Sequence, residues 1–142
     1  MTFEDFQIGQ SWLTPTATMT EGLVMEFARL TGDTNSLHTD PEAARKSLFG
    51  KPVAHGLLVL STVVGLWMRV GLVGVVFGGF DKVRFLKPVF FGDRVCAKFF
   101  TTALQDRGGY GLVVLHNEVL NQKGETVMVF DARLAACRGG TQ

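Results

Sequence analysis

The order of hydrophobic and polar residues along the chain predicts helices first and strands later. A first strand is expected from about Gln10 to Met19, where β-branched threonines surround Pro15. From Glu21 to Thr31, apolar residues recur at helical spacing and charged residues lie on the other side. This segment is predicted to be an amphipathic helix that ends at Gly32, and a polar segment without period, Asp33 to Thr39, follows it.

Two more helices are expected before the strands begin. Asp40-Pro41-Glu42 combines an N-cap, an N1 proline and an acidic first turn, and it predicts a short helix to about Leu48. The segment Phe49 to Pro52 breaks this helix. Gly56 to Met68 is then apolar on every side but shorter than the ~20 residues of a membrane span. It is therefore expected to be a helix surrounded by protein.

Four strands are predicted after about Val73, separated by turn signals. These signals are Gly78-Gly79, Gly92-Asp93, Asp106 to Gly109 and Asn121 to Gly124. The last strand is the clearest, because apolar residues alternate from Met128 to Leu134. The turns are too short for parallel crossovers, so the sheet should be antiparallel. Such a sheet curled around one long apolar helix is the α+β hot-dog fold, here expected as a single domain over residues 1–142.

Composition narrows the function classes. The 142 residues are 46% hydrophobic and 19% charged, so part of the apolar surface is expected to meet another subunit. Lys and Arg total 14 against 13 Asp and Glu, without a long run of one sign, which argues against a nucleic-acid partner. The first ten residues lack a secretory pattern, and Cys96 and Cys137 have no metal-type spacing. A cytoplasmic protein with ordinary thiols and no membrane partner is expected.

Asp33 and His38 are the first candidates for chemistry, because both lie in the break between two predicted helices. A carboxylate and an imidazole on one loop can share a water, one taking its proton while the other orients it. The same residues also fit a purely structural role, in which Asp33 caps a turn, Asn35 forms an Asx-turn and His38 lies on the surface.

His55-Gly56 is the second candidate, at the start of the apolar helix. The free N–H groups and the positive dipole end of a helix start can stabilise an oxyanion. The alternative is that Gly56 allows close packing and His55 only caps or packs.

Together these residues resemble a known family. Gly32-Asp33-x-Asn35-x-x-His38-x-Asp40, followed by Val53-Ala54-His55-Gly56-Leu57-Leu58, is similar to the two-part motif of MaoC-like (R)-specific enoyl-CoA hydratases. The stretch from Val83 to Asp93 is similar to a strand and turn found further along the same family.

The resemblance implies reversible addition of water to a trans-2-enoyl-CoA, giving an (R)-3-hydroxyacyl-CoA. It implies that Asp33 and His38 activate the water and that the Gly56 N–H binds the thioester carbonyl. It also implies at least a dimer. No metal or redox cofactor is expected, since coenzyme A is part of the substrate.

Further residues are candidates for substrate binding, and two departures from the family pattern bear on them. The candidates are Asn35, His55, Ser61, Lys82, Arg84 and Lys87. The last three form a basic cluster that either meets coenzyme A phosphates or is simply solvated. Ser36 stands where the family commonly has a proline, and Val64 stands where several relatives have a serine. Ser61, one helical turn earlier, could take the place of that serine. His116 is expected to be structural.

The same fold leaves other functions open. The acid, the histidine and the glycine would equally serve a dehydratase of another hydroxyacyl thioester, such as a branched or dicarboxylic CoA ester or an acyl-carrier-protein substrate. Thioester hydrolysis is a further option on the fold. A non-catalytic acyl-CoA-binding subunit is the alternative from a different class.

Overall fold

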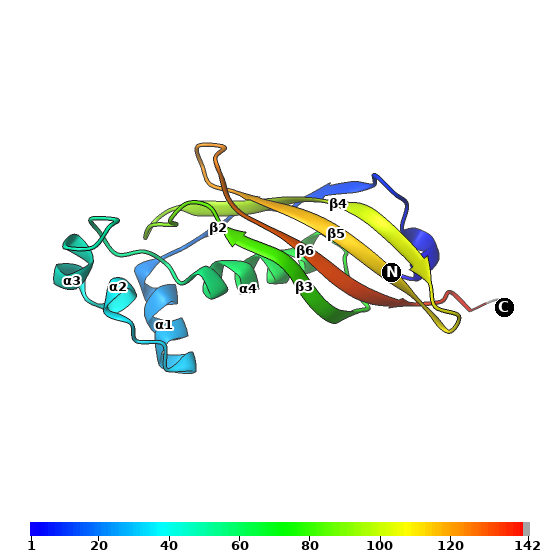
Figure 1. The fold of residues 1–142 in the computed structure, drawn as a ribbon, viewed down its shortest axis with the longest axis horizontal. Helices are drawn as coiled ribbons and strands as arrows, with labels where there is room; N and C mark the ends of the chain where they lie inside the picture. Colours follow the sequence, from blue (N-terminus) through cyan, green and yellow to red (C-terminus); the bar gives the residue numbers. More distant parts are fainter. Residues whose placement is uncertain (141–142) are drawn as a thin grey trace.

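The computed structural model describes residues 1–140 of the 142-residue chain. Figure 1 shows long strands wrapped around one helix, with a group of helices at one end and both termini at the other. The helices are η1 Phe3–Asp5, α1 Glu21–Thr31, α2 Ser36–Thr39, α3 Pro41–Arg45, α4 Gly56–Trp67 and η2 Met68–Val70. The strands are β1 Ser11–Leu13, β2 Ala17–Thr18, β3 Val75–Phe85, β4 Arg94–Asp106, β5 Tyr110–Leu120 and β6 Thr126–Cys137.

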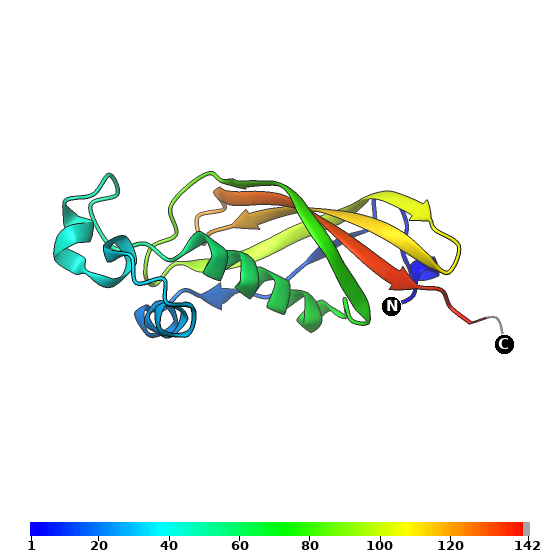
Figure 2. The same cartoon turned by 60° about the horizontal axis from the view of Figure 1, so that its bottom comes forward.

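The strands form one antiparallel sheet in the order β1-β4-β5-β6-β3, and β2 also pairs with β4. In Figure 2 the sheet curls over α4, which lies along its inner face. This arrangement confirms the predicted α+β hot-dog fold and the four long strands after Val73. In both views one end of α4 lies toward the group of helices α1–α3, so the helix start lies beside the segment between α1 and α3.

Local signals explain where α1 and α3 begin and end. Thr20 caps α1 by accepting a hydrogen bond from Leu23 N at 3.1 Å, and Gly32 ends it with a φ of 78°. Asp40 caps α3, whose first residue is Pro41. Helix α3 ends at Arg45, three residues before the predicted end at Leu48, because turns follow it.

Three segments differ from the predictions. The strand expected from Gln10 to Met19 splits into β1 and β2, and Pro15, which cannot donate to a ladder, lies in the gap. The polar segment contains a helix, α2, started by the side chain of Asn35. Gly78-Gly79 is not a turn but lies within β3, where the pairing with β6 shifts register. A φ of 153° at Gly79 and the close approach of Gly78 to the Arg133 carbonyl explain why glycines stand there.

The core lies between α4 and the inner face of the sheet. The buried side chains of α4 are Leu58, Val59, Leu60, Val63, Leu66 and Trp67. They pack against alternate residues of the long strands, such as Phe99 and Phe130. Burying each large apolar side chain contributes about 1.5–3 kcal/mol. The Trp67 indole N–H donates to the Asn117 side-chain oxygen at 3.2 Å, so the far end of α4 is also fixed by a buried hydrogen bond.

One face of α4 is uncovered within the single chain, although its sequence is apolar all round. Leu57 is 61% exposed and Met68 48%, and Ser61 and Gly65 lie on the same exposed face. The neighbouring edge strand β3 exposes Val76, Phe77 and Phe80 in addition. These exposed apolar side chains agree with the expected meeting with another subunit. None of the helices in residues 1–140 is long and apolar enough to cross a membrane.

Candidate active site

The segment between α1 and α3 is held by a chain of local hydrogen bonds. Asp33 N donates to the Thr31 hydroxyl at 3.2 Å, and Asn35 N donates to the Asp33 carboxylate at 3.4 Å. The Asn35 side chain then accepts from Leu37 N at 3.0 Å and starts α2. One helical turn is therefore built from a polar sequence, and it places His38 back beside Asp33.

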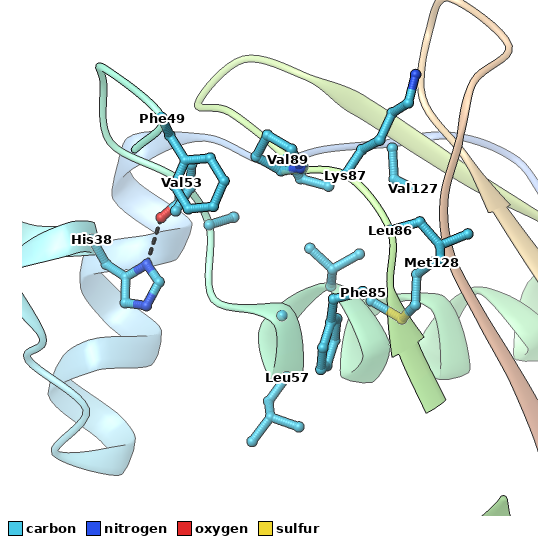
Figure 3. A pocket seen from close by; sticks show the side chains of 14 residues that line it. His38, Phe49, Val53, Leu57, Phe85, Leu86, Lys87, Val89, Val127 and Met128 are labelled. Atoms are coloured by element: carbon cyan, nitrogen blue, oxygen red, sulfur yellow. Dashed lines mark hydrogen bonds between the residues drawn. The ribbon is translucent and has the colours of Figure 1, made fainter. Parts of the chain in front are cut away.

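A backbone hydrogen bond fixes the protonation pattern of His38. Its Nδ1 lies 2.6 Å from the Val53 carbonyl oxygen, which can only accept. In the neutral ring the hydrogen must therefore be on Nδ1, and Nε2 keeps its lone pair. Figure 3 shows this bond and places the half-buried ring beside the start of α4. His38 is thus prepared to accept a proton through Nε2.

Asp33, His38 and His55 come together although 22 residues separate the first from the last. One side-chain atom of each residue, a carboxylate oxygen or an imidazole nitrogen, lies within 4.8 Å of the corresponding atoms of the other two residues. Within residues 1–140, no hydrogen bond joins the Asp33 carboxylate directly to either imidazole. A separation of this size is bridged by one water that donates to two acceptors. The carboxylate is exposed, so such a water can enter from solvent.

The same three residues are a poor set of metal ligands. The rings of His38 and His55 pack face against face in a tilted arrangement, with centroids 3.9 Å apart and planes inclined by 30°. Nitrogen lone pairs lie in the ring planes, so those of two stacked rings run side by side and do not converge on one ion with good geometry. The expectation that no cofactor is needed remains a prediction.

Gly56 is the first residue of α4, and its N–H forms no hydrogen bond with any residue from 1 to 140. His55 precedes it without capping the helix through its side chain, so the positive end of α4 is open. A Cβ at position 56 would lie 2.5 Å from the Phe85 ring. Glycine is therefore required for Phe85 to pack against the helix start.

A cavity of about 300 Å³ begins at these groups and is otherwise mostly apolar. It is lined by His38, Phe49, Val53, Ala54, Gly56, Leu57, Val59, Phe85, Leu86, Lys87, Pro88, Val89, Val127 and Met128. Figure 3 shows these side chains around the start of α4, with His38 at one end. A base and an open backbone donor at one end of an apolar cavity suit an acyl group whose polar, reactive end lies between them.

The other predicted site residues are divided by the structure. Lys87 lines the cavity and pairs with Glu125, whereas Lys82 lies 4.0 Å from Asp131. The guanidinium of Arg84 donates to the carbonyl of its neighbour Val83. The three cations thus do not face one site.

Three further predicted contacts lie outside the cavity lining. Asn35 acts as the cap of α2, His55 is buried, and Ser61 lies on the exposed face of α4. Their assignment to substrate binding remains a prediction. His116 lies on β5, where its Nδ1 is 2.6 Å from the Asp131 carboxylate.

Sequence reasoning missed two aromatic residues that line the cavity, Phe49 and Phe85. Phe49 had a usable signal, since it lies in the break just before the second motif. Phe85 had none, because its contact with Gly56 depends on how β3 crosses the helix.

This architecture and site define a hot-dog domain of the hydratase and dehydratase type. The chain matches the family model described as the MaoC like domain over residues 5–123. It therefore belongs to the MaoC-like dehydratase family, whose members are hydro-lyases.

Relatives in sequence cover different shares of the chain. The MaoC protein of Klebsiella aerogenes is 40% identical over 94 residues, which are 66% of this chain but 28% of that protein. The 3-hydroxyacyl-thioester dehydratase Z of Mycobacterium tuberculosis is 36% identical over 107 residues, or 72% of this chain and 68% of the relative. This chain thus spans a minor part of the Klebsiella protein's length.

Solved structures agree over nearly the whole chain. An Archaeoglobus protein described as a monoamine oxidase regulatory protein superposes with a TM-score of 0.93 at 38% identity, covering 99% of this chain and 96% of the other. The (R)-hydratase of Aeromonas caviae described as involved in PHA biosynthesis has a TM-score of 0.81 at 29% identity, covering 92% of this chain and 97% of the other. Homologues of this fold also include complexes of different chains.

Proposed function

We propose that this chain is an (R)-specific enoyl-CoA hydratase, which reversibly adds water to a trans-2-enoyl-CoA to give an (R)-3-hydroxyacyl-CoA. The observation that carries the proposal is the position of a proton acceptor, His38 Nε2, and an open N–H, Gly56, at one end of an apolar cavity. The similarity to the Aeromonas (R)-hydratase supports the choice of reaction and product.

The proposed reaction uses both acceptors on one water. An ionised Asp33 carboxylate and the neutral His38 ring can each accept one hydrogen of the same water, which leaves an oxygen lone pair directed away from both. The water then loses a proton to the pair as its oxygen bonds to the β-carbon. The electrons of the double bond move toward the thioester oxygen, and the α-carbon afterwards receives a proton from the pair. One water is thus added, and the reverse sequence is dehydration.

Gly56 acts where charge builds up. The thioester oxygen becomes negative only as the new bond forms, so an N–H and a helix dipole directed at it stabilise the transition state more than bound substrate. Apolar side chains around the cavity exclude water and strengthen this interaction.

We further propose that the substrate is a coenzyme A ester whose phosphates lie in a second hollow. This hollow, of about 370 Å³, adjoins the apolar cavity at Lys87 and Pro88, which line both. Lys51 and Lys123 also line it, and within residues 1–140 neither has a carboxylate partner within 4.0 Å. Asp93 and Glu125 line the hollow as well, and Glu125 pairs with Lys87. Lys51 and Lys123 are therefore the positive charges proposed to meet the phosphate groups at the end of the pantetheine arm.

An assay with crotonyl-CoA tests the function. Loss of the enoyl-thioester absorbance is expected, and the product should be oxidised by an (R)-specific but not by an (S)-specific 3-hydroxyacyl-CoA dehydrogenase. Release of free thiol would instead indicate a thioesterase, and binding without either change would indicate a non-catalytic acyl-CoA-binding subunit. Much faster dehydration of hydroxyacyl thioesters on a carrier protein would favour the dehydratase alternative, which the mycobacterial relative's name suggests.

Charge variants test the proposed phosphate hollow. Replacing both Lys51 and Lys123 with glutamine should raise the KM for crotonyl-CoA by about 10-fold and leave the KM for the crotonyl thioester of N-acetylcysteamine, which lacks phosphates, unchanged. Lys82→Gln is the matched control and should change neither. Equal effects on both substrates would place the phosphates elsewhere.

A further inference from the structure

His55 is a fully buried histidine within the site, and its contacts differ from those of a residue that binds substrate. It is 2% exposed and does not line the cavity. Its Nε2 lies 2.9 Å from the Asp33 backbone oxygen, and its ring stacks on His38 and contacts Phe27 at a centroid distance of 4.9 Å. It therefore touches both members of the catalytic pair and nothing that a substrate could occupy.

We propose that His55 is a positioning residue, which holds Asp33 and His38 in register with the start of α4. This inference rests on the proposed function, since it assigns the residue a role in that reaction. His55 acts through one hydrogen bond and one ring stack, without contacting substrate or carrying the transferred proton.

The hydrogen bond to Asp33 shows which ring nitrogen of His55 carries the hydrogen. The Asp33 carbonyl can only accept, so the ring hydrogen is on Nε2, and the neutral ring then has a bare Nδ1. That Nδ1 is buried and has no hydrogen-bond partner within residues 1–140. A second proton there would create a buried charge without an acceptor, against the stacked ring of His38. His55 therefore donates through Nε2 to the Asp33 carbonyl, whereas His38 donates through Nδ1 to the Val53 carbonyl and keeps its Nε2 free.

The hydrogen bond matters because little else ties the acid to the rest of the fold. Among the hydrogen bonds of residues 32–36, the bond to His55 is the only one that reaches a residue distant in sequence. All the others join residues at most five positions apart. Without it, residues 32–36 would be held only by local hydrogen bonds, and the nearest long-range contacts would be those of Leu37 and His38 with Val53.

His55 also connects the two halves of the site. It immediately precedes Gly56, so the residue that holds Asp33 is bonded covalently to the residue with the open N–H. Movement of the acid relative to α4 would change its distance from the thioester oxygen. A misplacement of about 1 Å can cost about 10²-fold in rate, which sets the scale of the expected effect.

Two substitutions at position 55 separate positioning from packing. In His55→Gln, the side-chain amide nitrogen can take the place of Nε2 and donate to the Asp33 carbonyl, but the ring is lost. In His55→Phe, a ring of similar size keeps the stack on His38, but the donor is lost. The proposal expects His55→Gln to retain kcat within about 10-fold and His55→Phe to lose about 10²-fold, both with nearly unchanged KM for crotonyl-CoA.

The competing roles give different results. If His55 only fills space, the phenylalanine variant should be the more active of the two. If it binds substrate, KM should rise in both variants while kcat changes little. Either outcome would overturn the proposal, provided circular dichroism and thermal unfolding show both variants folded. In a His38→Ala background, His55→Phe should cost little more, because the positioned pair has already lost a member.

A measurement without turnover separates this inference from the proposed reaction. Nitrogen NMR of the ¹⁵N-histidine-labelled protein should show His55 with its hydrogen on Nε2, hydrogen-bonded to the Asp33 carbonyl. This result is expected even if crotonyl-CoA proves not to be a substrate. Hydrogen on Nδ1 with a bare Nε2 would refute the positioning geometry itself.

Discussion

Replacing Gly56 tests the open N–H at the start of α4. Gly56→Pro removes this hydrogen, and proline is well accommodated at the first position of a helix. The preceding residue, His55, has φ −57° and ψ 132°, which is the extended conformation that a following proline requires. The backbone should therefore accept the substitution without unfolding.

The structure also shows why proline alone would be ambiguous. Any Cβ at this position lies 2.5 Å from the Phe85 ring, so the ring must move and the cavity lining changes. Gly56→Ala imposes the same displacement but keeps the N–H, and it is the matched control. The ratio of the alanine rate to the proline rate then isolates the lost donor.

The expected ratio follows from the role of the donor. Loss of one hydrogen bond to a developing oxyanion costs about 10²–10³ in kcat, or about 2.7–4 kcal/mol. Initial rates of crotonyl-CoA hydration by both variants, with circular dichroism and thermal unfolding as folding controls, give this ratio directly. If the two folded variants differ by less than about 3-fold, the thioester carbonyl does not bind the Gly56 N–H.

Three further outcomes are expected. Asp33→Asn and His38→Ala should each lower kcat by about 10²–10⁴-fold with folding intact. The double variant should be little worse than the poorer single variant, because both residues act on one water. Fully multiplicative losses of kcat would contradict a joint role. The edge strand β3 and the exposed face of α4 should pair with a second copy, so sedimentation at micromolar concentration should show a dimer or larger species, and an active species of 15.5 kDa would refute this. Hydrogen bonds from the Gly139 backbone and the Arg138 side chain lower the pKa of Glu4 from 4.5 to about 2. The folded pKa lies below the unfolded one, so this contribution is complete above about pH 4.5 and is lost as the pH falls toward 2. Arg138→Met should flatten the acid dependence of the melting temperature in that window.

The elements that the sequence predicted well are those whose signals are local. The caps and helical period of α1, the N1 proline of α3 and the alternation along β6 each depend on residues within a few positions of one another. The predictions failed where a local signal had two meanings. Gly78-Gly79 resembles a turn in sequence, but its backbone is fixed by pairing with β6, where Gly79 faces Arg133, 54 residues further along the chain.

The candidate site was predicted to the extent that the two motifs describe it. Asp33, His38 and Gly56 could be named from their order and spacing. The structure places His38 and Gly56 in the lining of one cavity and Asp33 close to His38. Their supporting contacts could not be predicted. That His55 is directed at a backbone carbonyl, and that Phe85 covers Gly56, are consequences of three-dimensional packing that leave no pattern along the chain.

Helix α4 is anchored at both ends, by the site contacts of His55 at its start and by the Trp67–Asn117 hydrogen bond near its end. This helix, about 18 Å long, is therefore held in a fixed position relative to the sheet. Adaptation to a longer or bulkier acyl chain would then have to occur in the walls around it, such as Phe49, Leu86 and Met128. Variant libraries aimed at new substrates should therefore change those lining residues and leave α4 unchanged.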